Sequence, residues 1–348
     1  MNGLSMDSPA LDALCRALKG RCERLEVCLN SVSAEDDVNR NEVHKVRVAC
    51  RRLTAILEIL AEEFPDLRQR KLHRAVRDIR RTCGEVRDLD VRCEFLEGLV
   101  SQASIEDSEV IEWLCEQTNR QRRWTLRRLQ RDWSKLVATA RAGAASVWPQ
   151  FSQLALAPSA PPKSFGAVGA RVLRRRLDEL WSFTTDDVRR PECLHQLRIV
   201  CKRLRYATEV FRPILHLSFR EEFYPQLPHL QDLLGMQHDA VEGRRALKHQ
   251  RRQLRRMARS RHRRRKRLSG FKKREIIAGI DAVRLAYSQL ADQARGEFLE
   301  LWPEFSGRGF RIPVEELLKD LAETRFPPPE EPPATPISTT PNSREATI

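Results

Sequence analysis

Two stretches of the sequence decide the fold: residues 44–54 read HKVRVACRRLT, and residues 195–205 read HQLRIVCKRLR. They align without a gap at an offset of 151 residues. A second pair of segments, GEVRD at 84–88 and GMQHD at 235–239, keeps the same offset. Two motifs with one shared offset identify an internal repeat, so the chain is predicted to contain two copies of one structural unit.

Both copies are predicted to be helical. Apolar residues recur at spacings of three and four along most of the chain, and no long run alternates apolar with polar residues. The predicted fold class is therefore all-α, with a first repeat over 10–142 and a second over 163–305. The Ala-, Pro- and Ser-rich stretch 143–162 predicts a linker, and the proline-rich stretch 326–348 predicts a disordered tail.

The positive charge of the chain is concentrated in one segment. The 348 residues include 63 Lys+Arg and 48 Asp+Glu, a formal net charge of +15. Residues 244–274 alone contain 17 Lys/Arg and no Asp/Glu. A basic chain of this kind favours a polyanionic partner, and outside the segment any anion site must come from the arrangement of side chains.

Cysteine usage and hydropathy indicate a cytoplasmic protein. The nine cysteines form no CxxC pair, so we expect buried thiols rather than a disulfide framework or a zinc site. The first ten residues have neither a basic start nor an apolar run, so we expect no signal peptide. No apolar run is long enough for a transmembrane helix, so no membrane partner is expected.

On a helix, each repeated segment gathers cations on one side and apolar residues on the other. The two cationic stripes consist of His44, Arg47 and Arg51 in the first copy and His195, Arg198, Lys202 and Arg205 in the second. The opposite sides consist of Val46, Cys50, Leu53 and Leu57, and of Leu197, Cys201 and Leu204. Cations at these spacings repel one another, whereas a linear polyanion offers repeated phosphates that guanidinium groups bind in bidentate fashion.

The stripes also have a simpler interpretation. Charged helix faces are commonplace on solvated surfaces, and Glu58 and Glu209 could neutralise part of each stripe. His44 and His195 could be packing or hydrogen-bonding groups, although a nearby phosphate would favour their protonated form. Because both copies carry the same stripe, the sequence favours anion binding over a merely solvated face.

The second motif lies on a predicted helix that is rich in arginine. Arg77, Arg80 and Arg87 share a face with Gly84, whose missing side chain could let an anion approach the backbone. Gly84 could instead mark a kink, with Asp88 as a local cap or as an ion-pair partner that orients Arg87. The sequence leaves these alternatives open.

At these two motifs the sequence resembles the CHAD family, the conserved histidine α-helical domain. The family pattern is approximately H-x-x-R-x-x-x-[RK]-R-L-R followed by L-G-x-x-x-D, in two tandem copies. Residues 44–54, 83–90, 195–206 and 234–239 match this pattern in order, and the resemblance covers about 10–300. It implies two antiparallel four-helix bundles with long helices, related by a pseudo-twofold axis around a basic central groove. It also implies binding of inorganic polyphosphate, in some members at polyphosphate granules.

The sequence departs from the family pattern at several positions. Thr54 stands where the family has arginine, and in the second copy Gln231 and His238 stand opposite Arg80 and Arg87, so we expect the two halves to contribute unequally. An ExExK motif, which marks family members fused to a triphosphate-tunnel domain, does not occur. No P-loop or Ser/Cys–His arrangement occurs either, so we expect no enzyme, and no metal or cofactor.

The predicted function is non-enzymatic binding of polyphosphate in a groove between the two repeats. The alternative is a nucleic-acid-associated protein that binds phosphate backbones through residues 244–274. The candidate polyphosphate-binding residues are His44, Lys45, Arg47, Arg51, Arg52, Arg77, Arg80, Arg87, His195, Arg198, Lys202, Arg203, Arg205 and His238.

Overall fold

The computed structural model describes residues 4–32, 38–101, 105–156, 163–259 and 273–322. Within these ranges the chain is helical and contains no β-strand beyond one isolated bridge between Pro9 and Ser164. The all-α prediction is therefore confirmed. The predicted disordered tail at 326–348 and the densest part of the basic segment lie outside the described residues.

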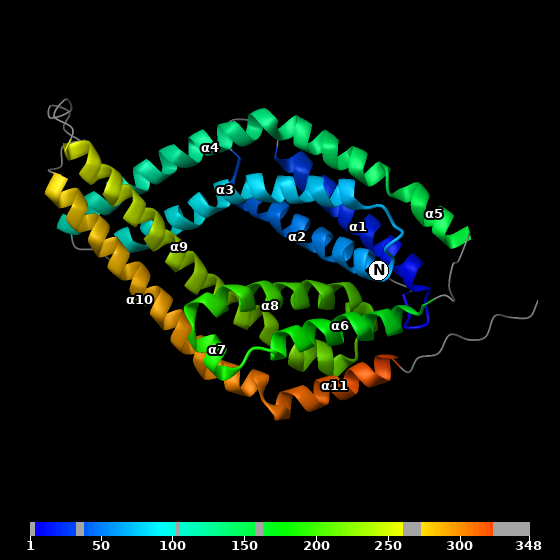
Figure 1. Ribbon diagram of the computed structural model, residues 1–348. Coiled ribbons are helices and arrows are strands. Elements are labelled where there is room, and N and C mark those ends of the chain that lie inside the picture. Colours follow the sequence, from blue (N-terminus) through cyan, green and yellow to red (C-terminus); the bar gives the residue numbers. More distant parts are fainter. Residues whose placement is uncertain (1–3, 33–37, 102–104, 157–162, 260–272, 323–348) are drawn as a thin grey trace, which may run out of the picture.

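The two repeats contain corresponding helices (Figure 1). The first repeat consists of α1 (Ala10–Ser31), α2 (Arg40–Glu63), α3 (Arg70–Val100), α4 (Ile105–Ala145) and α5 (Trp148–Leu156). The second consists of α6 (Phe165–Trp181), a short α7 (Thr185–Arg189), α8 (Pro191–Phe211), α9 (Gln226–Arg259), α10 (Lys273–Ser306) and α11 (Arg308–Ala322), with single turns η1 (Arg212–Ile214) and η2 (Phe219–Phe223) after α8. Helices α2 and α8 begin 151 residues apart, the offset of the sequence repeat.

The described residues form more α-helices than the expected four in each repeat, five in the first repeat and six in the second. The predicted linker 143–162 is helical through Leu156, because α4 runs to Ala145 and α5 follows. Val147 and Phe151 are buried in the core there. The second repeat likewise continues past its predicted end at 305, because α11 packs along α6 and buries three apolar residues, Val314, Leu318 and Leu321.

The motif helices α2 and α8 have the two faces that the sequence predicted. Asn39 and Glu42 form a capping box at the start of α2, and α8 starts with a proline in its first turn, where no backbone donor is needed. The predicted apolar faces are buried in both helices, with every member 1 % exposed or less. They are Val46, Cys50, Leu53 and Leu57, and Leu197, Cys201 and Leu204.

One main hydrophobic core joins the two repeats. It contains side chains from helices of both, among them Leu53 of α2 and Leu204 of α8, and α2 contacts α8 directly. Ion pairs add to this contact at the end of α2, where Glu62 and Glu63 bind arginines of α6 such as Arg171 and Arg175. The repeats therefore hold a fixed position relative to each other.

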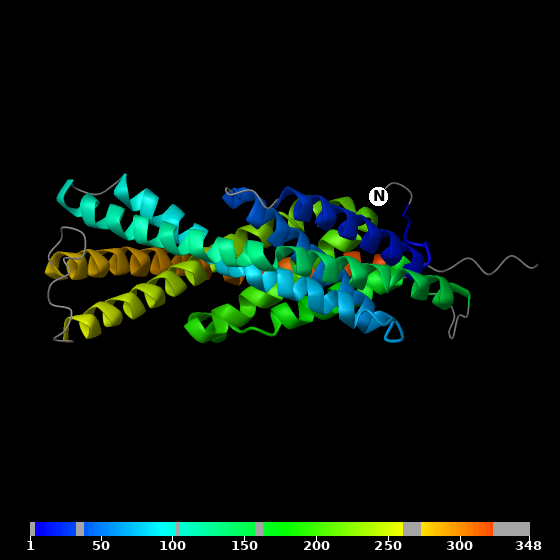
Figure 2. The same cartoon turned by 90° about the horizontal axis from the view of Figure 1, so that it is seen from above.

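A second, smaller core lies where the hairpin α3–α4 meets the hairpin α9–α10. The rings of Phe95 and Tyr287 stack there with centroids 3.9 Å apart, and Gly279 leaves room for Val110 on the opposite hairpin. In Figure 1 the helices consequently surround a central opening. Figure 2, a view turned by 90°, shows that the molecule is thin in the direction perpendicular to Figure 1. The motif helices face this opening from both sides.

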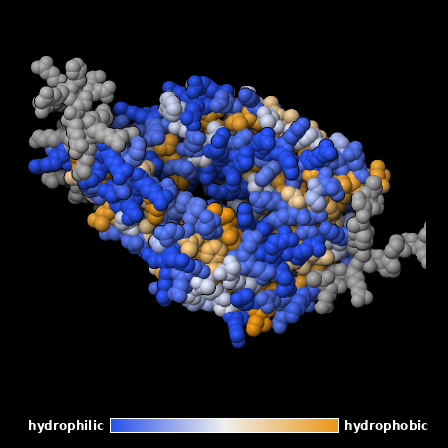
Figure 3. Space-filling model, in the orientation of Figure 1, coloured by the Kyte–Doolittle hydropathy of each residue, from blue (hydrophilic) through white to orange (hydrophobic). Residues whose placement is uncertain are grey.

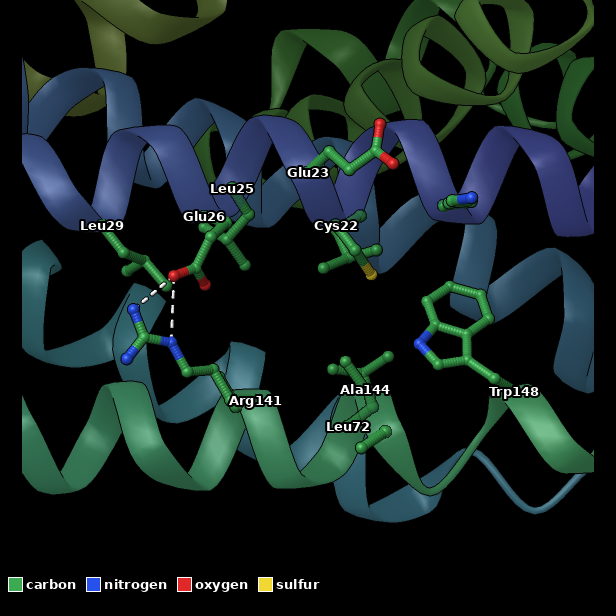
Figure 4. A pocket seen from close by; sticks show the side chains of 13 residues that line it. Cys22, Glu23, Leu25, Glu26, Leu29, Leu72, Arg141, Ala144 and Trp148 are labelled. Carbon is green, nitrogen blue, oxygen red and sulfur yellow. Dashed lines mark hydrogen bonds and ion pairs between the residues drawn. The ribbon is translucent and has the colours of Figure 1, made fainter.

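An apolar cavity of about 500 Å³ lies between α1 and α4, away from the central opening. Leu29, Leu72 and Ala144 contribute to its lining. In Figure 4, Trp148 stands at one end, and Arg141 stands at the other, where it donates hydrogen bonds to Glu26. Its apolar walls do not suit a polyanion.

Nine thiols are present without a disulfide, but they are not uniformly buried. Cys50, Cys83, Cys93 and Cys201 are buried, and the other five are half-buried, in contrast to the prediction. Burial raises the pKa of Cys83 and Cys201 to about 12, so these groups are thiols. No helix in the described ranges is long and apolar enough to span a membrane.

Candidate anion-binding site

A cavity of about 930 Å³ occupies the central opening, and Figure 3 shows it as a hollow surrounded by hydrophilic surface. Helices α2, α3, α8, α9 and α10 all line it. Its cationic lining consists of Arg47, Arg51, Arg87, Arg92, Arg198, Lys202 and Arg205. Its acidic lining consists of Asp88, Asp232, Asp239 and Glu242. Cations therefore outnumber carboxylates, and they come from both repeats.

The structure brings together eight of the fourteen candidate residues. The residues that line the cavity are His44, Arg47, Arg51, Arg87, Arg198, Lys202, Arg205 and His238. The residues that do not are Lys45, Arg52, Arg77, Arg80, His195 and Arg203. The predicted convergence of Arg47, Arg51, Arg198 and Lys202 on one cavity is therefore present, and a binding role for the fourteen candidates stays a prediction.

Helix geometry explains which candidates stay outside. Lys45 and Arg203 each lie next to a stripe rather than on it, and both are exposed. Arg52 turns toward Glu209, whose Oε2 lies 2.7 Å from its Nε. His195 is exposed, yet its ring lies 5.1 Å from that of the lining residue His238. His195 thus stands beside the cavity and not in its wall.

Arg77 and Arg80 lie on α3 but outside the cavity wall. Arg77 is exposed, and Arg80 is half-buried near Arg47. Arg87 does line the cavity, where its guanidinium is held by both oxygens of Glu94 at 2.8 and 3.2 Å. The first-repeat arginines of the second motif therefore do not act as a single group.

The glycine of the second motif differs between the two repeats. A Cβ at Gly84 would lie 2.5 Å from Nη1 of Arg47, so the missing side chain makes room for this guanidinium and not for an anion. A Cβ at Gly235 would meet no atom within 4 Å, and Gly235 lines the cavity. The expected close approach of an anion to the backbone is thus possible at Gly235 and blocked at Gly84.

Lys202 lies at the centre of the cationic group. Burial, together with the neighbouring guanidiniums of Arg51 and Arg198, lowers its pKa to about 6. Arg47 and Arg198 have pKa values below the usual range for the same reason, burial first and then nearby cations. The cavity therefore holds more positive charge than its own carboxylates compensate.

The histidines are poor bases in the ligand-free cavity. Burial and then Arg87 lower the pKa of His44, and burial and then Arg198 lower the pKa of His238 to about 4. An anion beside them would favour their protonated forms. Nowhere in the described ranges do three or more His, Cys, Asp or Glu side chains gather into a group that could hold a metal ion.

The two motif carboxylates partner the stripe arginines. Asp239 Oδ1 lies 3.9 Å from Nη2 of Arg198. Burial raises the pKa of Asp88, the charge of Arg47 lowers it, and the charge of Asp239 raises it. Asp88 and Asp239 thus approach each other across the repeats, and each lies near the arginine of its own stripe. This arrangement favours the ion-pair interpretation of these residues.

The sequence matches the family model of the CHAD domain over residues 16–248, which is more than half of the chain. The protein belongs to the CHAD domain family. No curated protein matches the sequence at a significant level.

Two solved structures are similar to this CHAD chain. The crystal structure of the CHAD domain from the plant Ricinus communis aligns with a TM-score of 0.54 at 18% identity, over 93% of this chain and 95% of that one. PptA from Streptomyces chartreusis aligns with a TM-score of 0.56 at 15% identity, over 85% of this chain and 99% of that one. At these identities the likeness shows a shared fold.

Several residues of the CHAD cavity were missed by the sequence analysis. Arg92 lies one turn after Asp88 on α3, so extending the stripe by four residues would have found it. Tyr206 follows directly after Arg205 in the repeated motif. Tyr287 comes from α10, where no motif marks it, and its ring reaches the cavity because Gly243 has no side chain.

The basic segment 244–274 of this CHAD chain is only partly described. In its first part, Arg245 pairs with Glu242 and Arg251 pairs with Asp281, so α9 and α10 neutralise some of its charge. Its densest part, 261–267, lies outside the described residues. Nucleic-acid binding by this segment stays a prediction.

Proposed function

We propose that this chain binds inorganic polyphosphate in the central cavity and catalyses no reaction on it. The observation that carries the proposal is the convergence of Arg47, Arg51 and Lys202 from two repeats on one cavity. Among the described residues none of these three forms an ion pair within 4 Å. The chain belongs to the CHAD family. The resemblance to this family implies polyphosphate binding, which supports the same ligand.

The electrostatics of the cavity favour an anion with several charges. Nε of Arg92 and Nε of Arg198 are buried without a hydrogen-bond partner in the described structure, and unsatisfied buried donors of this kind are costly. A single phosphate could reach few of these groups at once. A chain of phosphates supplies successive oxygens to cations on both α2 and α8, and it also neutralises their mutual repulsion.

A binding role rather than catalysis fits the chemistry of the cavity. Its carboxylates Asp88 and Asp239 lie beside arginines, and the buried thiols of the motif helices have raised pKa values. Chains longer than the cavity would continue along its rim, past His195. On this proposal the protein accompanies long polyphosphate, including granules, in the cytoplasm.

A pair of charge reversals tests the proposed site. We expect R51E/K202E to weaken binding of long-chain polyphosphate by about 10²- to 10⁴-fold, because each charge-assisted contact contributes about 1.5–3 kcal/mol. The matched control is K45E/R203E, which replaces one Lys and one Arg by Glu on the same two helices at exposed positions outside the cavity. We expect this control to weaken binding less than tenfold.

Calorimetric titration with polyphosphates of several lengths measures both variants, and circular dichroism checks that their helicity is retained. Equal losses in R51E/K202E and K45E/R203E would show that binding depends on overall charge, and would refute the cavity as the site.

A further inference from the structure

The outer face of α4 carries a second cationic surface that the sequence analysis did not single out. From Arg120 to Lys135 the helix contains seven Lys/Arg and one acidic residue, Asp132. Arginines recur there every three or four residues, on the side opposite the buried Thr125 and Leu129. We define the α4 stripe as Arg120, Arg123, Trp124, Arg127 and Arg131, all of which are exposed.

Much of the charge on this stripe is uncompensated. Arg120 pairs with Glu116 on the same helix, 3.2 Å away, and both side chains are more than 60 % exposed. Arg123, Arg127 and Arg131 form no ion pair with any residue that the structure describes. No residue of α4 lines the central cavity, so the stripe and the cavity are separate surfaces. Figure 1 shows α4 along the outer edge of the molecule.

Trp124 stands in the middle of the stripe and is 61 % exposed. It is the one aromatic side chain in the described ranges that is largely exposed. The guanidinium of Arg128 lies 5.5 Å from the centre of its ring, and Arg128 is itself paired with Glu85 of α3. One face of the indole is therefore covered by a cation that is fixed in place, and the other face is free to contact a planar ligand.

An exposed tryptophan among regularly spaced arginines matches the chemistry of a single-stranded nucleic acid. Such ligands bind through stacking of bases on aromatic rings and through phosphate contacts to a basic surface. One helical turn advances 5.4 Å, so Arg123, Arg127 and Arg131 present a cation about once per turn to a strand that runs along α4. We propose that the α4 stripe binds single-stranded RNA or DNA, with a base stacked on Trp124.

Other polyanionic partners fit this surface less well. Polyphosphate has no bases, so Trp124 would contribute nothing to it, and a duplex hides its base faces in the stack. A membrane surface would need several apolar side chains on one face, whereas the neighbours of Trp124 on the stripe are arginines. In the described part of α10, the stretch Asp281–Arg295 contains only two arginines and two aspartates, so it carries no comparable cationic stripe.

Anisotropy of a fluorescent twelve-nucleotide oligo-dT tests the proposal. We expect W124A to weaken binding about tenfold or more, and W124F to lose less, since phenylalanine still stacks. We expect R123Q/R127Q/R131Q to weaken binding at least as much and to reduce the slope of log K against log salt by about two. The matched control R70Q/R74Q/R81Q removes three exposed arginines from α3, and we expect a change below threefold.

Two ligand controls separate stacking from charge. An abasic strand with the same number of phosphates should bind W124A and the parent equally, and so should polyphosphate. The proposal is overturned if W124A binds oligo-dT as tightly as the parent, or if the α3 control loses as much as the α4 triple variant. The proposal is also overturned if Trp124 is needed for binding to phosphatidylserine vesicles but not for binding to oligo-dT. The α4 stripe would then be a membrane-binding surface.

Discussion

Lowering the pH from 7.5 to 6.0 should tighten polyphosphate binding through Lys202. Its pKa is about 6 in the ligand-free protein, against an ordinary value near 10.5, because the side chain is buried beside Arg51 and Arg198. A bound polyanion opposes both effects and raises this pKa. Binding therefore takes up a proton, and affinity rises as the pH falls from the pKa of the bound form toward that of the ligand-free form.

The size of this effect follows from the pKa of Lys202. At pH 7.5 an ammonium group with a pKa of about 6 is charged in only about 3 % of molecules, and charging it costs about 2 kcal/mol. At pH 6.0 half of the molecules are already charged. We therefore expect the dissociation constant to fall about 15-fold between these two pH values, and the contribution of Lys202 to level off below about pH 5.

Calorimetry in two buffers with different ionisation enthalpies measures this proton uptake directly. At pH 7.5 we expect close to one proton per bound site, and K202R serves as the control because its guanidinium stays charged throughout. The variant should bind with less pH dependence than the parent over the same window, and the remaining dependence should come from His44 and His238 in the cavity wall. The explanation is refuted if K202R keeps the slope of the parent, or if binding at pH 7.5 takes up no proton.

Three further predictions concern ionic strength, the two motif glycines and a buried ion pair. Polyphosphate affinity should fall log-linearly with salt and stay unchanged with EDTA; loss on chelation that zinc restores would indicate a metal site. G235A should raise the melting temperature, since Ala favours a helix by about 0.5–1 kcal/mol and the methyl group has room. G84A should gain less and should weaken polyphosphate binding, because Arg47 must move; equal effects in both variants would contradict this. D90A should cost about 3–5 kcal/mol in urea unfolding, because it leaves Arg122 buried without its carboxylate, and D90L/R122M should recover most of that loss; equal stability of the single and double variants would contradict this.

The repeat could be predicted from the sequence because its signals are local. The offset of 151 residues and the spacing of apolar residues placed α2 and α8 and gave the buried faces of both. The extra helices were missed because prolines were interpreted as breaks. Pro149 lies in the first turn of α5, where a proline costs no hydrogen bond. Pro303 and Pro313 both lie inside helices, and the chain turns at Gly307 between them.

The composition of the cavity depends on contacts that one helix alone does not reveal. Arg51 and Arg52 are adjacent in the sequence, but a rotation of 100° directs one to the cavity and the other to Glu209 on α8. Glu209 also approaches Arg205 at 3.6 Å, so it restrains a lining arginine. Arg205 and Glu209 are one helical turn apart, but Arg52 and Glu209 are distant in sequence and carry no shared motif. Tyr287 enters the cavity for the same reason, through the contact between the two hairpins.

The small core around Phe95 and Tyr287 allows the two hairpins to separate without unfolding of the main core. The main core joins both repeats through many helices, whereas the small one joins only the ends of two hairpins. Regions with few buried apolar contacts open at a lower free-energy cost than the whole protein, so hydrogen exchange should be faster at the hairpin ends than in α2 and α8. If polyphosphate binds in the cavity and enters between the separated hairpins, the chain would be bound along its middle. The capture rate should therefore increase with chain length, whereas entry by threading would depend on the number of chain ends.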